Sequence, residues 1–173
     1  LSSLRSSMGM VPQDAFLFSD SIYNNIAFGK EGATQEEVIS ASKKAKVHKN
    51  ITSFSKAYET VLGERGITLS GGQKQRVSIA RALIKDPSIY LFDDCLSAVD
   101  TETEEAILKT LKQSAKGKSC LIVSHRVSAA KNADKIIVLE DGKKIQEGTH
   151  HELVQTNGYY KALYDSQSAQ KEK

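Results

Sequence analysis

Short apolar segments separated by helical sequence most constrain what this chain can fold into. Residues 89–92 and 120–123 are apolar runs of strand length, and between them Ile107, Leu108 and Leu111 recur at helical spacing. Strands that are apolar on both faces are typical of parallel sheets that helices cover on both sides. The order strand, helix, strand therefore predicts an α/β fold with a parallel sheet.

Helical spacing dominates residues 19–86. Ser19 and Asp20 are residue types that cap helices, so we expect a first helix to begin directly after them. Thr34 and Glu37 have the spacing of a capping box, which predicts a second helix from residue 35. Residues 71–85 are again helical, so the whole stretch is expected to form a helical subdomain.

Strand signals lie on both sides of this helical stretch. Residues 8–11 resemble a strand, and Pro12 ends it because proline has no N–H to donate to a sheet. Residues 136–139 and 143–145 flank Asp141-Gly142, a dipeptide typical of tight hairpin turns. From residue 150 onward the pattern is helical.

Composition excludes several classes of function. The 173 residues include 24 Lys and Arg against 21 Asp and Glu, a net charge of +3. A charge this small gives no reason to expect a nucleic-acid partner. No apolar run approaches the 18 residues that a membrane-spanning helix needs, so this segment is expected to be soluble.

Cys95 and Cys120 lack metal or redox spacing and are expected to be packed, reduced thiols.

Polar residues follow three of the predicted strands. Gln13 comes after the first, Asp93 and Asp94 end the second, and His125 follows the third. Because parallel strands have their carboxyl ends at one edge of the sheet, these side chains are expected to surround a ligand crevice. Each residue taken alone also fits an ordinary loop position.

The start of the predicted helix 71–85 is a second candidate site. The residues there are Leu69, Ser70, Gly71, Gly72 and Gln73. Unpaired N–H groups and the positive end of the helix dipole attract anions, and glycines let a phosphate come close. The alternative is that the two glycines only form a turn.

The motifs resemble, in order, those of the ATP-binding cassette (ABC) ATPases. Leu-Ser-Gly-Gly-Gln-Lys-Gln-Arg at 69–76 resembles the signature motif. Val-Pro-Gln-Asp at 11–14 resembles the Q-loop, Tyr-Leu-Phe-Asp-Asp at 90–94 the Walker B strand, Ser-Ala-Val-Asp at 97–100 the D-loop and Ile-Val-Ser-His at 122–125 the switch histidine. The resemblance covers essentially the whole chain. It implies a P-loop NTPase-like (RecA-like) parallel sheet with an inserted α-helical subdomain.

The same resemblance implies a division of the chain. Residues 1–18 would hold the Q-loop strand of the core, 19–86 the helical subdomain with the signature motif, 87–149 the core with Walker B, D-loop and switch histidine, and 150–173 the C-terminal helices and tail. Residues 60–66, Thr-Val-Leu-Gly-Glu-Arg-Gly, resemble the X-loop of exporters. In that family the X-loop and the Q-loop lie against the coupling helices of a transmembrane domain.

For the strand-end residues the resemblance implies catalytic and metal-binding roles toward ATP. Asp93 and Gln13 are expected to serve Mg²⁺. Asp94, His125 and Gln13 are expected to be catalytic, acting on the attacking water and the γ-phosphate. Both cofactors, ATP and Mg²⁺, are implied by the family.

For the helix start the resemblance implies a partner. In the family two nucleotide-binding domains pair head to tail, and each signature loop contacts the ATP held by the other domain. Leu69, Ser70, Gly71, Gly72, Gln73 and Asp100 are expected to bind nucleotide in this way. The second domain is identical or different, so the dimer is either a homodimer or a heterodimer.

The chain departs from the family pattern at Asp94, where hydrolytic cassettes carry Glu. The carboxylate is one methylene shorter, and a misplacement of about 1 Å can lower a rate about 10²-fold. Slow or absent hydrolysis is therefore expected, as in the degenerate halves of heterodimeric exporters. The alternative is that Asp94 still works through an additional water.

A second departure is the missing Walker A motif. Gly117-Lys118-Ser119 precedes a strand instead of following one, so we expect a helix-to-strand turn there. Because the phosphate loop of the family precedes the Q-loop, it is expected upstream of Leu1. The sheet is then expected to be incomplete at its N-terminal side, with an exposed edge. The isolated chain is expected to bind ATP weakly and not to hydrolyse it.

The expected function is part of the ATP-binding cassette of an ABC exporter, at the cytoplasmic face of the cell membrane. Such a cassette couples ATP binding and hydrolysis to transmembrane transport. Two alternatives remain, a soluble ABC-family ATPase and a catalytically degenerate cassette that senses nucleotide. Between Gln13 and Leu69 there is no room for the long coiled coil that many soluble relatives carry.

Overall fold

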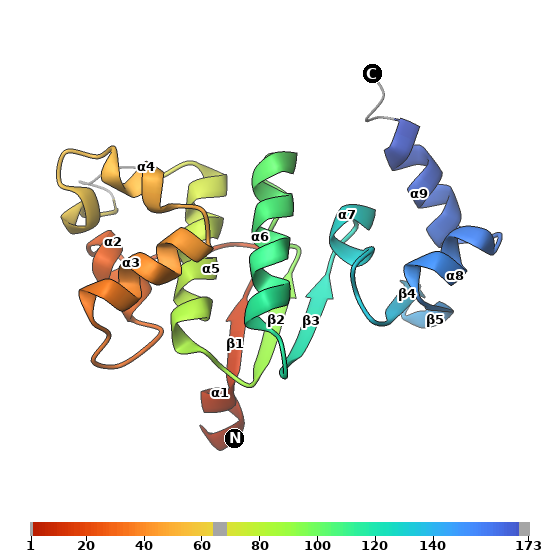
Figure 1. Cartoon of the computed structure of the whole chain (residues 1–173), viewed down its shortest axis with the longest axis horizontal. Helices are drawn as coiled ribbons and strands as arrows, with labels where there is room; N and C mark the ends of the chain where they lie inside the picture. The colour runs from red at the N-terminus through yellow and green to blue at the C-terminus, as the bar shows by residue number, and fades with distance from the viewer. Residues whose placement is uncertain (1, 64–68, 170–173) are drawn as a thin grey trace. The chain divides into compact units, whose positions relative to one another are not determined.

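The computed structural model describes residues 2–63 and 69–169 (Figure 1). The chain forms two compact units, Leu1–Val123 and Ser124–Lys173, and each is described by itself. Within the described ranges no helix is both long and apolar enough to cross a membrane.

The described part of the first unit contains a three-stranded parallel sheet. Its strands, in sheet order, are β1 (Met8–Val11), β2 (Ile89–Asp93) and β3 (Ser119–Val123). Val11 pairs with Phe92, and Asp93 pairs with Val123. The carboxyl ends of all three strands therefore lie at one edge of the sheet, which confirms the predicted parallel α/β architecture.

Helices supply the rest of the first unit. They are α1 (Ser2–Ser7), α2 (Ile22–Ala27), α3 (Gln35–Lys44), α4 (His48–Thr52), the short 3₁₀ helix η1 (Ala57–Glu59), α5 (Gly71–Lys85) and α6 (Thr101–Ser114). Helices α2 and α3 pack against α5, and α5 packs against β1 (Figure 1). One continuous core joins the helices to the sheet and includes Ile22, Val38, Val77, Phe92 and Ile107.

The first helix of the helical stretch begins later than predicted. Its N-cap is Ser21, whose hydroxyl accepts a hydrogen bond from the Asn24 N–H at 3.0 Å. Asp20 does not cap, because its carboxylate instead accepts from the Ser21 N–H and from the Asn24 side-chain amide. The prediction of Ser19 and Asp20 as caps was therefore wrong by one to two residues.

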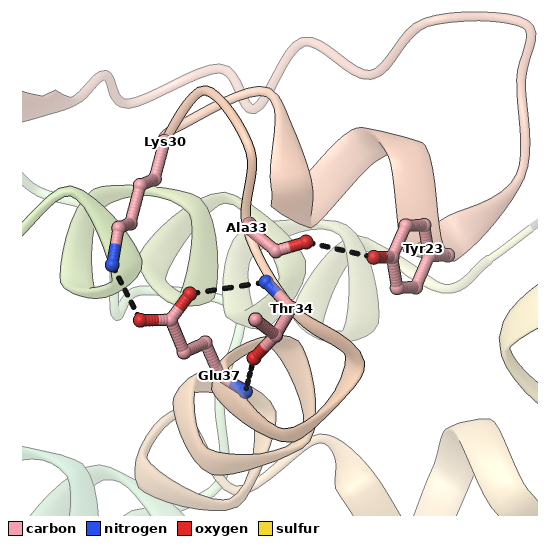
Figure 2. Close-up of polar contacts among 5 residues, drawn as sticks. All are labelled: Tyr23, Lys30, Ala33, Thr34 and Glu37. Carbon is pink, nitrogen blue, oxygen red and sulfur yellow. Dashed lines mark hydrogen bonds and ion pairs between the residues drawn. The ribbon is translucent and has the colours of Figure 1, made fainter.

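The predicted capping box at the start of α3 is confirmed, and Figure 2 shows its contacts. The Thr34 hydroxyl accepts from the Glu37 N–H at 3.3 Å, and the Glu37 carboxylate accepts from the Thr34 N–H at 3.0 Å. Lys30 pairs with the other Glu37 oxygen, while the Tyr23 hydroxyl donates to the Ala33 carbonyl. These contacts order the loop that leads into α3.

Replacing Thr34 by Ala should lower the free energy of unfolding by about 1 kcal/mol, because the first turn of α3 loses its side-chain acceptor. Urea denaturation of the chain measures the change. Gln35→Ala, at the next exposed position, is the matched control. Equal unfolding midpoints for the two variants would show that the capping box does not stabilise the fold.

The two faces of the sheet differ in exposure. Val11, Tyr90 and Phe92 are buried on one face. On the other face Met10 and Leu121 lie in one register row and are each 58% exposed. Burial on both faces was therefore a wrong prediction for the described part of the sheet. An apolar sheet face of this kind is typical of a surface that further protein covers.

The two cysteines also differ. Cys95 is buried, and burial raises the pKa of its thiol to about 12. Cys120 is exposed on β3, so the prediction of a packed thiol was wrong at this position. The reason is that the described part of the chain covers β3 poorly, so that none of its five residues is buried.

The described part of the second unit contains an antiparallel hairpin and three helices. The elements are α7 (Val127–Ala130), β4 (Ile136–Glu140), β5 (Lys143–Gly148), α8 (His150–Gln155) and α9 (Tyr159–Ala169). Asp141 and Gly142 both have positive φ, +48° and +74°, which confirms the predicted tight turn. Val138, Leu153 and Tyr160 belong to a separate small core.

Candidate functional site

Three of the predicted residues lie at the carboxyl edge of the sheet. Gln13 follows β1 and is exposed, whereas Asp93 ends β2 and, like Asp94, is half-buried. The parallel register brings these strand ends to the same edge. His125 follows β3 but belongs to the second unit.

The backbone of Asp94 forms a sharp turn at this edge. Its φ is +40°, a left-handed conformation that Asp and Asn adopt more readily than most residues. The Asp94 N–H donates to the Val123 carbonyl at 2.8 Å, and its carbonyl accepts from the Ser97 hydroxyl at 3.0 Å. The Cα position at residue 94 is therefore held by its neighbours on both sides.

The Asp93 and Gln13 side chains suit Mg²⁺ in donor chemistry. Mg²⁺ prefers oxygen ligands, keeps several waters and is usually held by one or two protein carboxylates together with phosphates. Asp93 offers a carboxylate and Gln13 an amide oxygen at the same edge of the sheet. No group of three or more His, Cys, Asp or Glu side chains that could enclose a metal occurs among the described residues. These two donors fit a metal ion whose remaining ligands come from water and from the phosphates of a nucleotide.

The start of α5 is a capping box. The Ser70 hydroxyl accepts from the Gln73 N–H at 3.3 Å, and the Gln73 side chain accepts from the Ser70 N–H at 3.0 Å. Ser70 and Gly71 are exposed, while Leu69 is buried beneath them. The first turn of this 15-residue helix is thus ordered by its own side chains and presents its N-terminal end to solvent.

The two glycines of this turn have different surroundings. A Cβ added at Gly72 would lie 2.7 Å from the Ala98 carbonyl oxygen, so only glycine fits against the 97–100 loop. A Cβ added at Gly71 would meet only the Ala98 Cβ, at an ordinary 3.7 Å. Contacts with the described residues therefore explain why residue 72 is glycine and give no such reason at Gly71.

Gln75 connects this helix to two of the predicted motifs, and sequence reasoning missed it. Its side chain is 6% exposed. The amide oxygen accepts from the Ala98 N–H at 3.3 Å, and the amide nitrogen donates to the Gln13 carbonyl at 3.4 Å. The available signal was spacing, because residue 75 lies on the same helix face as residues 71 and 72.

Asp100 is exposed and caps α6. Its carboxylate accepts from the Thr103 N–H at 2.9 Å, and this hydrogen bond lowers the pKa of Asp100, with a further contribution from Arg76. Of the two predicted caps, Asp100 and Thr101, the structure selects Asp100. Arg76 itself donates to the Gly72 carbonyl at 3.1 Å.

Gln167 holds the loop that carries His125 within the second unit. The Gln167 amide nitrogen donates to the His125 carbonyl at 2.8 Å, and the amide oxygen accepts from the Val127 N–H at 2.9 Å. His125 is exposed. Sequence reasoning had no signal for this contact, because 42 residues separate Gln167 from His125.

The segment Gly117-Lys118-Ser119 is a helix-to-strand turn, as predicted. Gly117 has a φ of +75°, and Lys118 pairs with the Asp86 carboxylate. Asp86 lies before β2 and Lys118 before β3, so both are at the amino edge of the sheet. Lys118 is therefore at the opposite edge from Asp93 and cannot serve a phosphate there.

An aromatic patch, formed by Phe16, Phe18 and Phe28, lies on the surface of the first unit. The three side chains are 64%, 37% and 69% exposed, and consecutive ring centroids are 5.1 Å and 4.8 Å apart. Arg81 lies over the Phe18 and Phe28 rings and donates to the Phe16 and Asn25 carbonyls. Residues 64–66 of the stretch that resembles the X-loop lie outside the described residues.

Comparison with known proteins decides the family. The profile of the family described as ABC transporter matches residues 1–97, more than half of the 173 residues. This chain belongs to the ABC transporter family.

Its relatives are much longer than the chain. It is 49% identical to the uncharacterized ABC transporter ATP-binding protein YknU of Bacillus subtilis, over 96% of this chain and 28% of that protein. It is 52% identical to the multidrug resistance-like ATP-binding protein MdlA of Buchnera aphidicola, over 97% of this chain and 29% of that protein. The chain thus spans less than a third of these relatives.

A solved structure confirms the fold. A bacterial Atm1-family ABC exporter with ATP bound matches with a TM-score of 0.91 and 43% identity, over 96% of this chain and 30% of that chain. The predicted P-loop NTPase-like α/β fold of this ABC chain is therefore confirmed.

Proposed function

We propose that this chain is part of the ATP-binding cassette of an ABC exporter, which couples ATP binding and hydrolysis to transport across the cell membrane. The observation that carries the proposal is Gly71, an exposed glycine at a helix N-terminus for which no contact with the described residues accounts. Its place in the Ser70-Gly71-Gly72 turn of an ABC family chain favours close approach by a phosphate from outside. The cassette would lie at the cytoplasmic face of the membrane.

The strand-end residues would serve the nucleotide bound by this cassette. Mg²⁺ would neutralise charge on the ATP phosphates, with Asp93 and Gln13 supplying oxygen ligands. Asp94 would orient or deprotonate the attacking water, and His125 would donate a hydrogen bond to the γ-phosphate. The half-buried carboxylates at the sheet edge support these roles.

The helix start would serve a nucleotide bound by a second domain. In the proposed head-to-tail dimer the exposed Ser70 and Gly71 would face the partner's ATP. The exposed Asp100, at the end of the loop that packs on Gly72, would contribute to the same contact. Leu69 and Gln73 support the turn from inside, as core residue and as capping partner. The partner is a second cassette, either identical or different.

The aromatic patch would contact the transmembrane domain. Exposed aromatic side chains grouped on one surface are typical of protein contacts, because they bury large apolar area at low entropic cost. Phe16 and Phe18 directly follow the Q-loop sequence, so a coupling helix docked there would act on Gln13 through a short backbone path. We propose the same role for the stretch at 60–66 that resembles the X-loop.

We assign each part of the chain a proposed role from the motifs that it carries. Residues 1–18 and 87–149 would form the nucleotide-binding core, 19–86 the helical subdomain and 150–173 the C-terminal helices.

A soluble ABC-family ATPase is the weaker alternative, because a 49% identical relative is named a putative multidrug export ATP-binding/permease protein. A degenerate cassette within an exporter remains a specific second candidate because of Asp94.

Gly71→Ala tests the proposal in the full-length protein. ATP turnover should fall at least about 10-fold, because a methyl group would occupy the space of a phosphate oxygen. The chain itself should lose no stability, since the added Cβ makes only one ordinary contact. Steady-state ATP hydrolysis and urea denaturation measure the two effects.

Two control variants sharpen this test. Lys109→Ala changes an exposed position of α6, outside the signature motif, and should leave turnover unchanged. Gly72→Ala should destabilise the chain itself by about 1–3 kcal/mol, because its Cβ would overlap the Ala98 carbonyl. If Gly71→Ala retains full turnover, the proposed nucleotide contact is wrong.

A further inference from the structure

The Gln75 side chain makes contacts that neither the proposed binding roles nor the core packing account for. A buried amide can be satisfied by water or by its own helix, yet both ends of this one bond to backbone groups of other segments. One of these segments is the loop of Gln13, and the other is the loop that leads to Asp100. Gln13 and Ala98 are 85 residues apart, so only the fold brings them to one side chain.

The Ala98 contact is supported by independent packing. The Ala98 carbonyl lies so close to Gly72 that a Cβ there would come within 2.7 Å of it. The 97–100 loop is therefore held against α5 twice, by close packing at Gly72 and by the hydrogen bond to Gln75. The loop after β1 is linked to α5 by the Gln75 bond to the Gln13 carbonyl and, three residues further on, by the Arg81 bond to the Phe16 carbonyl.

We propose that Gln75 is a positioning residue that ties two loops to the first turns of α5. One is the loop after β1 that begins with Gln13 (the Gln13 loop), and the other is the 97–100 loop that ends at Asp100 (the Asp100 loop). A displacement of the Gln13 loop, when a nucleotide or a coupling helix contacts it, is then transmitted to the Asp100 loop and to Ser70 on the partner-facing surface. The expected effect on ATP turnover rests on the proposed function, because the relative position of the two loops affects the rate of hydrolysis only if both contribute to an ATP site. The tie itself rests on the hydrogen bonds alone.

Hydrogen exchange of the Ala98 N–H in the 173-residue chain tests the tie without any nucleotide. Gln75→Leu keeps a side chain of similar size but removes the acceptor, so Ala98 exchange should rise roughly tenfold. Exchange at Val77 and Ile79 in the middle of α5 should stay unchanged. Gln113→Leu, the same substitution at an exposed position of α6, is the control.

ATP turnover in the full-length protein tests the consequence. Gln75→Leu should lower kcat roughly tenfold with little change in KM, because the loops are misplaced without losing a nucleotide contact. Gln75→Glu separates the two hydrogen bonds. At pH 8 its carboxylate still accepts from the Ala98 N–H but has no proton to donate to the Gln13 carbonyl. It should keep Ala98 protected and still lower kcat.

Each outcome decides one part of the proposal. Unchanged Ala98 exchange in Gln75→Leu would overturn the tie, and faster exchange throughout α5 would show that Gln75 only stabilises the helix. Increased Ala98 exchange with wild-type kcat would overturn the positioning role. If the unsubstituted full-length protein hydrolyses no ATP, the proposed function fails instead, and the exchange result still decides the tie.

Discussion

Replacing Asp94 by Glu in the full-length protein should increase ATP turnover at the site of this cassette by up to about 10²-fold, the factor that a carboxylate misplaced by about 1 Å can cost. The backbone at residue 94 is held by the Val123 carbonyl and by the Ser97 hydroxyl, so it cannot advance to compensate for the shorter side chain. The additional methylene of Glu would extend the carboxylate instead. Single-turnover hydrolysis at saturating ATP measures the gain.

The control for Asp94→Glu is Asp134→Glu, which adds the same methylene at an exposed position of the second unit. It should leave turnover unchanged. Binding of ATP must be measured alongside, because a gain in affinity would also raise the observed rate at low ATP. Equal turnover for Asp94→Glu and the unsubstituted protein, with ATP bound in both, would contradict the degenerate interpretation and show that Asp94 is competent.

Replacing Arg81 by Met should lower the free energy of unfolding of the chain by about 3 kcal/mol, because the half-buried guanidinium satisfies three acceptors. It donates to the Asn25 carbonyl at 2.7 Å, to the Asn25 side-chain oxygen at 2.9 Å and to the Phe16 carbonyl at 2.9 Å. Methionine fills a similar volume but removes the Arg81 donor from all three oxygens, so the Asn25 side-chain oxygen keeps only its hydrogen bond from the Phe18 N–H. Urea denaturation monitored by circular dichroism measures the loss.

The aromatic patch should change with the same substitution. Arg81 lies 5.3 Å from the Phe18 ring centroid and 5.8 Å from that of Phe28, so its removal takes a cation–π contact from each ring. Arg5→Met, at an exposed position of α1, is the control and should alter stability by less than about 0.5 kcal/mol. A loss below 1 kcal/mol for Arg81→Met would show that Arg81 does not hold the patch in place.

Features that depend on neighbouring residues were predicted well. The capping box of Thr34 and Glu37, the extent of α5 and the Asp141-Gly142 turn each involve groups a few residues apart, whose geometry the local backbone determines. The helix start at Ser21 was missed because three consecutive residues are capable caps. Their different hydrogen bonds, which depend on Asn24, decide among them.

Features that depend on distant residues were predicted poorly or not at all. Gln75 and Gln167 looked like ordinary helical residues, and their partners come from other segments of the chain. The sequence Gly-Gly does not show that a side chain fits at residue 71 and not at residue 72. The position of Ala98 in the folded chain makes that difference. The exposure of Leu121 was missed because an apolar run shows only that a strand is able to be buried. Whether other elements cover the strand depends on the tertiary structure.

The sequence by itself determined the order of the motifs, the parallel strand topology and the place of Gln13, Asp93 and Asp94 at the carboxyl edge of the sheet. These follow from local periodicity, from turn and cap chemistry and from motif spacing, all of which are read along the chain. Only the tertiary structure decided how the motifs are held. Packing of α5 against the 97–100 loop and the two bonds of Gln75 depend on long-range contacts, which no linear pattern encodes.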